Sequence, residues 1–232
     1  MNLCVIPARA GSKRVPNKNV REFGGRPILS YPIEAAKASG LFDAIAVSSE
    51  DQDIRTLAYD MGATLLLQRP VELADDHATT ADVMEHAVGM VEREMNVALD
   101  VVCCLYAPTP FVEADDLRSG FAALDEPTKH YALSVTEFDA PIWRALDIGR
   151  AGNGFIERPF FPEKAEVRTQ DLLKTYRDAG QWYFGRAGAW KNRVPIYGQW
   201  SVGVRIPRAR AIDIDTPEDW AFAEQLWRGR KA

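Results

Sequence analysis

A short basic loop near the start of the chain contains the residues best suited to do chemistry. Residues 6–19 combine a glycine–serine pair with four cationic side chains: Gly11, Ser12, Arg9, Lys13, Arg14 and Lys18. The whole protein carries a net charge of −5, so this local positive charge indicates an anionic ligand. Glycine lets the backbone approach a phosphate, and serine, lysine and arginine donate hydrogen bonds to phosphate oxygens. We therefore expect a phosphate-binding loop; the alternative is a basic loop that only faces solvent.

The loop matches neither of two common phosphate-binding patterns. The sequence contains no G-x-x-x-x-G-K-[ST], and no G-x-G-x-x-G follows the first apolar run. A P-loop ATPase and a dinucleotide oxidoreductase are therefore both disfavoured.

A second candidate site lies near the end of the chain, where Asp213 and Asp215 are two residues apart. On a strand, this spacing places both carboxylates on the same side, where they could share one Mg²⁺. The alternative is that they are ordinary acids at the start of a helix, because Thr216 and Pro217 follow them. We expect Asp219, one helical turn further on, to cap that helix.

Strand-like and helix-like segments alternate along the first part of the chain. We expect strands over 3–7, 44–47, 64–67, 100–106 and 131–137, and helices over 27–39, 51–59, 79–93 and 113–124. This rhythm predicts an α/β fold with a doubly wound, mostly parallel sheet. Ligands of such sheets bind beyond the carboxyl ends of the strands, so the basic loop after the first strand is correctly placed.

The rhythm breaks over residues 139–175, which are rich in proline, glycine and aromatic residues such as Trp143, Phe155 and Phe160. A segment of this length without a clear regular element favours a lid or a dimerisation arm over a plain surface loop. The pattern resumes at 181–184. We expect one domain over 1–232, with the 139–175 excursion inside it.

Composition excludes several classes of protein. With 47% hydrophobic and 26% charged residues, the chain is an ordinary globular protein, and its acidic balance argues against nucleic-acid binding. No apolar run is long enough to span a membrane, and the start of the chain is unlike a signal peptide. Its cysteines, Cys4, Cys103 and Cys104, lie in strand-like runs, which predicts reduced core thiols in a cytoplasmic protein.

The order of residues resembles the cytidylyltransferases of acidic nine-carbon sugars. That family opens with I-P-A-R-x-G-S-K-x-x-x-x-K-N, and this chain matches each fixed position: Ile6, Pro7, Ala8, Arg9, Gly11, Ser12, Lys13, Lys18 and Asn19. Residues 69–76 are similar to its R-P-x-E-L-A-x-D segment, and residues 213–219 to its D-I-D-T-x-x-D metal segment. The resemblance covers nearly the whole chain and implies the sheet of nucleotide-diphospho-sugar transferases.

The resemblance implies a reaction in which CTP and a nine-carbon keto sugar acid give a CMP-sugar and pyrophosphate. Arg9, Lys18 and Asp215 would be catalytic, and Mg²⁺ would bind Asp213 and Asp215. The implied nucleotide-binding residues are Ala8, Arg9, Gly11, Ser12, Lys13, Lys18, Arg69, Asp76, Thr79 and Thr80, although the two threonines are equally plausible as helix caps. The implied sugar-binding residues are Tyr106, Arg168, Gln170, Arg177 and Gln181. The excursion would form the arm of a homodimer.

Residues 103–107, 168–172 and 178–185 are most similar to the pseudaminic acid branch of this family, which supplies CMP-sugars for surface-glycan or flagellin glycosylation. Two departures bear on the sugar. That branch reads A-T-A-P-F where this chain has residues 107–111 as APTPF, and it often has histidine at the position of Arg177. The alternatives are sialic, legionaminic or 3-deoxy-octulosonic acid as substrate, and a nucleotide-binding regulator without catalytic activity.

Overall fold

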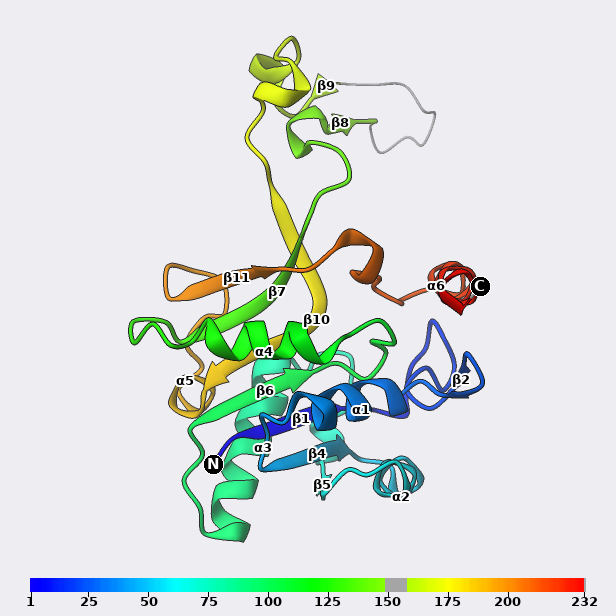
Figure 1. The fold of residues 1–232 in the computed structure, drawn as a ribbon, viewed down its shortest axis with the longest axis vertical. Helices are drawn as coiled ribbons and strands as arrows, with labels where there is room; N and C mark the ends of the chain where they lie inside the picture. Colours follow the sequence, from blue (N-terminus) through cyan, green and yellow to red (C-terminus); the bar gives the residue numbers. More distant parts are fainter. Residues whose placement is uncertain (149–157, 232) are drawn as a thin grey trace.

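Seven strands form one central sheet in the computed structural model, which describes residues 1–148 and 158–231 (Figure 1). The strand order is β11-β7-β10-β6-β1-β4-β5. The bounds are β1 Leu3–Pro7, β4 Ala44–Ser49, β5 Leu65–Gln68, β6 Val101–Leu105, β7 Tyr131–Glu137, β10 Tyr176–Arg186 and β11 Ser201–Arg205. Strand β10 runs antiparallel to both of its neighbours, and every other pairing in the sheet is parallel. The predicted mostly parallel sheet is confirmed; β11 was not expected.

Helices cover both faces of the sheet, as a doubly wound fold requires. The helices are α1 Ser30–Ser39, α2 Gln52–Asp60, α3 Thr80–Met95, α4 Ala114–Ala122, α5 Ala187–Lys191 and α6 Pro217–Lys231. Helix α1 packs beside α4 on one face, and α3 packs beside α5 on the other (Figure 1).

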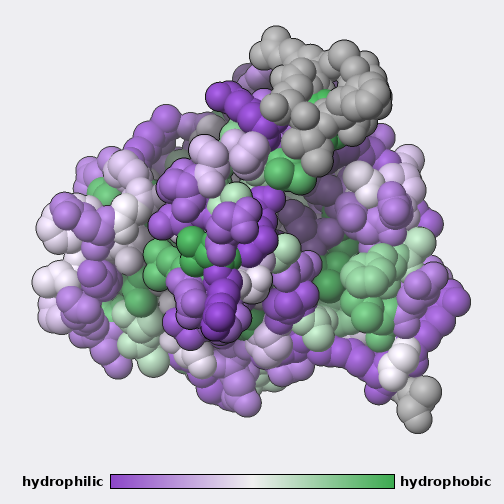
Figure 2. All heavy atoms as spheres, turned by 90° about the horizontal axis from the view of Figure 1, so that it is seen from above, coloured by the Kyte–Doolittle hydropathy of each residue, from purple (hydrophilic) through white to green (hydrophobic). Residues whose placement is uncertain are grey.

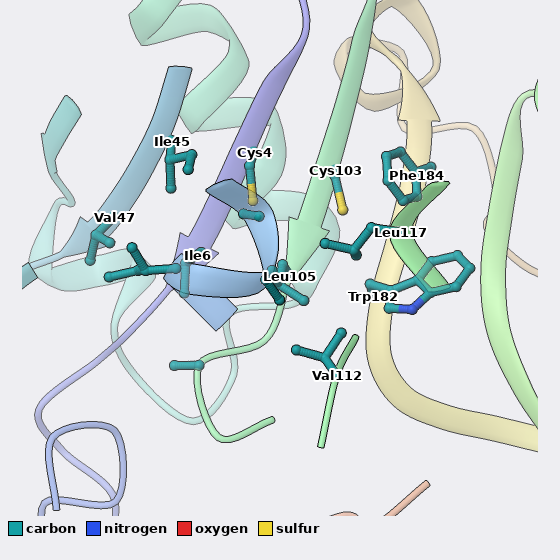
Figure 3. Close-up of a cluster of buried hydrophobic side chains, with 14 of the residues drawn as sticks. Cys4, Ile6, Ile45, Val47, Cys103, Leu105, Val112, Leu117, Trp182 and Phe184 are labelled. Carbon is teal, nitrogen blue, oxygen red and sulfur yellow. The ribbon is translucent and has the colours of Figure 1, made fainter. Parts of the chain in front are cut away.

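Alternate residues of the central strands supply two separate cores. Cys4 and Cys103 point into the core beneath α1 and α4, whereas Cys104 points into the core beneath α3. Figure 3 shows the first of these cores, with side chains of β1, β4, β6 and β10 on one side of the sheet. All three cysteines are free and buried, as predicted, and burial raises the pKa of the Cys103 and Cys104 thiols.

Local capping interactions fix where several of these helices begin and end. Helix α1 ends at Gly40, whose φ of 67° is the left-handed conformation that glycine adopts readily. The Asp51 carboxylate caps α2, and Thr79 and Asp82 form a reciprocal capping box at the start of α3. The second cap places residues 75–80 beside the carboxyl ends of the strands.

An arm projects from the sheet as a continuation of β7 and β10 (Figure 1). It contains a short pair, β8 Leu146–Asp147 and β9 Arg158–Pro159, and the 3₁₀ turns η2 Ile142–Arg144, η3 Pro162–Lys164 and η4 Thr169–Asp171. Trp143 packs edge to face on Phe161 and donates its ring N–H to the Leu173 carbonyl at 2.8 Å. Short regular elements thus occur where none was expected. Phe155 and the rest of 149–157 lie outside the described residues.

Smaller elements complete the molecule. They are the hairpin of β2 Glu22–Phe23 and β3 Arg26–Pro27, and the 3₁₀ turns η1 Val71–Leu73 and η5 Arg208–Arg210. The hairpin packs against α6 through a third cluster that contains Phe23 and Trp220. Seen from the end that carries the arm, most of the surface is hydrophilic and hydrophobic side chains form separate patches (Figure 2). Within the described ranges, no helix is both long and apolar enough to cross a membrane.

Candidate active site

A cavity of about 480 Å³ opens at the carboxyl ends of β1 and β6. Pro7 at the end of β1 and Tyr106 just after β6 line it, together with residues from the loops after β5 and η5 and from β10. The cavity brings together many of the residues expected to act on ligands: Arg9, Lys18, Arg69, Asp76, Thr79, Thr80, Tyr106, Asp213 and Asp215. These residues come from four distant parts of the chain, and the sheet places them at one edge.

Asp76 holds two cations of the basic loop. Its Oδ1 lies 2.9 Å from Nη1 of Arg9, and its Oδ2 lies 2.5 Å from Nζ of Lys13. The Lys13 ammonium and then the Arg9 guanidinium hold the pKa of Asp76 below its usual range. Arg9 also donates to the Asp75 carbonyl at 2.8 Å. The start of the basic loop is therefore tied to the segment that leads into α3.

Asp215 holds the other two cations. Lys18 places its Nζ 3.1 Å from Asp215 Oδ1 and donates to the Ile214 carbonyl at 2.7 Å, while Arg14 Nη2 lies 2.9 Å from Asp215 Oδ2. Lys18 is largely buried, with 16% of its side chain exposed, whereas Arg14 is 65% exposed. The Lys18 ammonium is thus fixed at the cavity wall, and Arg14 lies over the outer side of the same carboxylate.

The remaining loop residues shape the backbone. Asn19 donates from Nδ2 to the Arg9 carbonyl at 2.8 Å, so it braces the loop across its width. Ala8 is fully buried and donates its backbone N–H to the Ser48 carbonyl. A side chain at Gly11 would meet no protein atom within 4 Å, so packing within the protein does not explain the glycine. Ala8, Gly11, Ser12 and Lys13 do not line the cavity itself.

Asp213 and Asp215 lie on an irregular segment between η5 and α6, not on a strand as expected. Both nevertheless face the cavity. Desolvation by the surrounding side chains and then the neighbouring Asp215 carboxylate raise the pKa of Asp213, because both disfavour its charged form. Asp219 caps α6 as predicted: its Oδ2 accepts hydrogen bonds from the backbone N–H and the hydroxyl of Thr216, both at 2.7 Å.

The donor set suits a hard cation that completes its coordination with ligand oxygens. Within the described parts of the chain, no cluster of three or more metal-ligating side chains occurs. Two carboxylates alone could hold Mg²⁺, which usually binds one or two protein carboxylates, substrate phosphates and water. Asp213 and Asp215 fit that requirement, and a cation there would relieve the repulsion between them.

Arg69 and Glu50 form a buried polar floor beneath the loop. Arg69 donates from Nη2 to the Ser48 carbonyl at 2.8 Å, and Glu50 accepts the backbone N–H of Ala10 at 2.8 Å. Burial lowers the pKa of Arg69. Among the described residues, Arg69 Nε and Glu50 Oε2 find no hydrogen-bond partner. Sequence reasoning included Arg69 but assigned no role to Glu50.

The expected sugar-binding residues do not all meet at the cavity. Tyr106 lines it, and its hydroxyl lies 2.5 Å from Thr80 Oγ1. Arg177 donates to the Ala211 carbonyl at 3.1 Å, and Gln181 is buried and donates to the Arg210 carbonyl. Arg168 and Gln170 lie at η4 on the arm. Within one chain, none of these last four lines the cavity.

Two cavity residues with polar side chains, Asp178 and Tyr183, had no role predicted from the sequence. Asp178 lines the cavity and accepts hydrogen bonds from the hydroxyls of Tyr183 and Tyr197, the latter at 2.6 Å. Tyr183 also lines the cavity, although aromatic residues in a strand usually pack in the core. The signal that could have identified Asp178 is the glycine two residues later: Gly180 has a φ of 64° and interrupts the register of β10.

Comparisons with known proteins agree on the class of chemistry. The family model described as "Cytidylyltransferase" matches residues 3–226. Over 228 residues, 98% of this chain and 96% of the relative, the chain is 38% identical to the pseudaminic acid cytidylyltransferase of Campylobacter jejuni subsp. jejuni serotype O:2. It is 30% identical to the CMP-N,N'-diacetyllegionaminic acid synthase of Legionella pneumophila, over 97% of this chain and 95% of that protein.

Solved structures share the fold at low sequence identity. A CMP:2-keto-3-deoxy-manno-octonic acid synthetase complexed with CTP superposes with a TM-score of 0.68 at 17% identity, over 99% of both chains. A 4-diphosphocytidyl-2C-methyl-D-erythritol synthase superposes with a TM-score of 0.66 at 14% identity, over 97% of both chains.

Proposed function

This chain belongs to the cytidylyltransferase family and is a nucleotidyltransferase, and from that premise we propose that it makes CMP-pseudaminic acid. The substrates would be CTP and pseudaminic acid, and the second product pyrophosphate. The observation that carries the proposal is the meeting of Arg9, Lys18, Asp213 and Asp215 at one cavity. Cations and a carboxylate pair together are what phosphoryl transfer from a nucleoside triphosphate requires.

The proposed step is an in-line displacement at the α-phosphorus of CTP. The anomeric oxygen of the sugar forms a bond to this phosphorus, the bond to the bridging oxygen of the β-phosphate breaks, and pyrophosphate leaves. The hydroxyl proton passes to solvent or to a nearby base. Negative charge accumulates on the phosphate oxygens, so catalysis depends on positioning and on electrostatic stabilisation.

The loop side chains have distinct proposed roles in that step. Lys18 is held in the cavity wall, where its ammonium would stabilise charge on the α-phosphate. Arg9 and Lys13 would exchange their ion pairs with Asp76 for the β- and γ-phosphates. The open space beside Gly11 would admit a phosphate oxygen close to the backbone, where Ser12 could donate a hydrogen bond.

Asp213 and Asp215 would hold Mg²⁺, the family's expected cofactor. When bound, the ion supplies charge neutralisation for the triphosphate. To bind the ion, Asp215 would lose part of its contact with Arg14. The Arg14 guanidinium is exposed, so breaking this ion pair costs little free energy.

Arg69, Thr79 and Thr80 lie where they could contact the cytosine or the ribose. The unpartnered Nε of Arg69 provides a buried donor, which suits a base that presents acceptor atoms. The Thr79 hydroxyl is committed to the cap of α3, whereas the Thr80 hydroxyl has the Tyr106 hydroxyl as its partner and could exchange it for a ligand.

We further propose that two copies of the chain associate through the arm. Leu146, Phe160 and Leu173 are 49%, 55% and 73% exposed there, and apolar side chains gathered on one projecting segment suit an interface with another chain. Arg168 and Gln170 lie on the same arm, so a sugar contact by them would require an approach from a second copy. Light scattering coupled to gel filtration tests the dimer; a monomer at micromolar concentration contradicts it.

A pyrophosphate-release assay with a panel of sugar acids tests the proposed function. The purified protein is given CTP, Mg²⁺ and pseudaminic, legionaminic, sialic or 3-deoxy-octulosonic acid in turn. We expect the highest kcat/KM with pseudaminic acid. Faster turnover of another sugar acid would overturn the choice of sugar but not the reaction. If none of the four sugar acids is turned over, the result would support the alternative, a nucleotide-binding regulator without catalytic activity.

A further inference from the structure

We infer that Asp178 is a specificity-determining residue, which accepts a hydrogen bond from an acylamino N–H of the sugar acid. This inference rests on the proposed function, because it assigns a role at the same cavity. Asp178 belongs to β10 and lines the cavity beside Gly180 and Tyr183. Neither the resemblance nor the comparisons assign it a role.

The protein leaves one acceptor position of this carboxylate open. Two tyrosine hydroxyls, from Tyr183 and Tyr197, donate to Oδ2, and the backbone N–H of Gly180 donates to Oδ1 at 2.8 Å. A carboxylate has about four acceptor positions. Within the described parts of the chain, no lysine or arginine side chain forms an ion pair with Asp178. The remaining position on Oδ1 is therefore available to a ligand donor.

The charge of Asp178 limits what that donor can be. An anionic acceptor repels phosphate and carboxylate groups, so it favours the neutral part of the sugar acid. The adjacent wall is aromatic: Tyr106 and Tyr183 meet edge to face with ring centroids 5.7 Å apart. An acylamino group is complementary to both the carboxylate and the aromatic wall, because its N–H can donate to Asp178 while its methyl group packs on the rings.

Tyr197 fixes the orientation of the carboxylate from outside β10. It lies between α5 and β11, and its side chain is 67% exposed. Its hydroxyl donates to Asp178 Oδ2 at 2.6 Å. By occupying Oδ2 together with Tyr183, Tyr197 keeps Oδ1 directed to Gly180 and the cavity. It is thus a positioning residue, and Asp178 is the residue that would touch the sugar.

The test compares Asp178→Asn and Tyr197→Phe with a matched control, Tyr59→Phe. Tyr59 is 65% exposed on α2 and lies outside the cavity. KM and kcat are measured for CTP, for the best acylamino sugar acid and for 3-deoxy-octulosonic acid, which has no acylamino group. We expect Asp178→Asn to raise the KM of the acylamino sugar about tenfold or more, because a charge-assisted hydrogen bond is lost. The KM of CTP should not change.

Tyr197→Phe should raise the same KM by a smaller factor, and Tyr59→Phe should leave it unchanged. Equal losses for both sugars, or for CTP, would overturn the role of Asp178 and leave the proposed function intact. If an acylamino sugar other than pseudaminic acid is the best substrate, the choice of sugar fails but Asp178 is tested with that sugar. A wild-type preference for 3-deoxy-octulosonic acid would overturn both.

Discussion

Lys18 and Asp215 are 197 residues apart in the sequence, yet Lys18 Nζ lies 3.1 Å from Asp215 Oδ1. The basic loop and the acidic segment therefore form one site, in which a cation that would bind phosphate touches a carboxylate that would bind metal. In the free protein, the two charges neutralise each other at the cavity wall.

Replacement of Lys18 should abolish most of the activity without unfolding the protein. Lys18→Met keeps the aliphatic stem but removes the ammonium, so we expect kcat to fall by about 100-fold or more, as when one preorganised donor to a transition state is removed. Lys37→Met, in the last turn of α1, is the control and should retain activity. A fall in thermal stability that accounts for the lost activity would contradict a catalytic role. Pyrophosphate release and thermal unfolding provide both measurements.

Replacement of Asp215 should weaken metal binding. Asp215→Asn preserves size but removes the charge, so the Mg²⁺ concentration for half-maximal activity should rise by about tenfold or more. Titration of Mn²⁺ followed by electron paramagnetic resonance measures the metal directly, without turnover. The control is Glu218→Gln, an exposed acid in the first turn of α6. Unchanged Mn²⁺ affinity in Asp215→Asn would show that the metal binds elsewhere.

The basic loop could be predicted from sequence because its chemistry is local. Its cations, its glycine and its position after a buried strand are all visible in a dozen residues. Its ion pairs could not be predicted in the same way. Asp76 joins Arg9 to Lys13 only because the parallel sheet brings the loops after β1 and β5 to the same edge.

The sugar side of the cavity was less predictable, and β10 shows why. Side chains alternate along a regular strand, but the register of β10 against β7 shifts between Asp178 and Tyr183. Gln181 falls inside this irregular stretch and is buried, whereas Asp178 and Tyr183 both line the cavity. A sequence pattern with period two cannot anticipate such a bulge. The placement of Arg168 and Gln170 depends on an assembly that one chain does not specify.

Removal of the Asp219 cap should destabilise the protein in a pH-dependent manner. Burial acts to raise the pKa of Asp219, but hydrogen bonds from Thr216 outweigh it and the pKa is lowered. Because the pKa is lower in the folded state, the ionised carboxylate stabilises the fold fully above the unfolded-state pKa of about 3.9. This stabilisation is lost as the pH falls through the folded-state pKa.

Asp219→Ala should therefore lower the free energy of unfolding by about 1 kcal/mol at pH 7, the usual cost of a lost cap. The difference from wild type should shrink as the pH falls below about 4. Asp53→Ala, a first-turn acid of α2, is the control and should cost less. Urea unfolding at several pH values measures the free energy of unfolding of the wild type and of both variants. A constant difference down to the lowest pH would show that the effect does not depend on ionisation.

The Arg210–Asp116 ion pair should link the stability of the acidic segment to α4. Arg210 donates to both carboxylate oxygens of Asp116, one contact being 2.8 Å, and their side chains are only 12% and 10% exposed. Asp116→Ala leaves a largely buried guanidinium with one carboxylate fewer, so we expect a loss of about 3 kcal/mol. The exposed pair Arg118–Asp115 on the same helix is the control, and Asp115→Ala should cost no more than about 0.5 kcal/mol.

The same change should also weaken metal binding, because Arg210 lies three residues before Asp213 and anchors the start of the acidic segment. Mn²⁺ affinity is measured in Asp116→Ala below its unfolding temperature. The double variant Asp116→Leu with Arg210→Met removes both charges, so it should recover stability, since a matched apolar pair avoids the buried charge. It should not recover metal affinity if Arg210 positions the segment. Full recovery of both would show that the pair acts on stability alone.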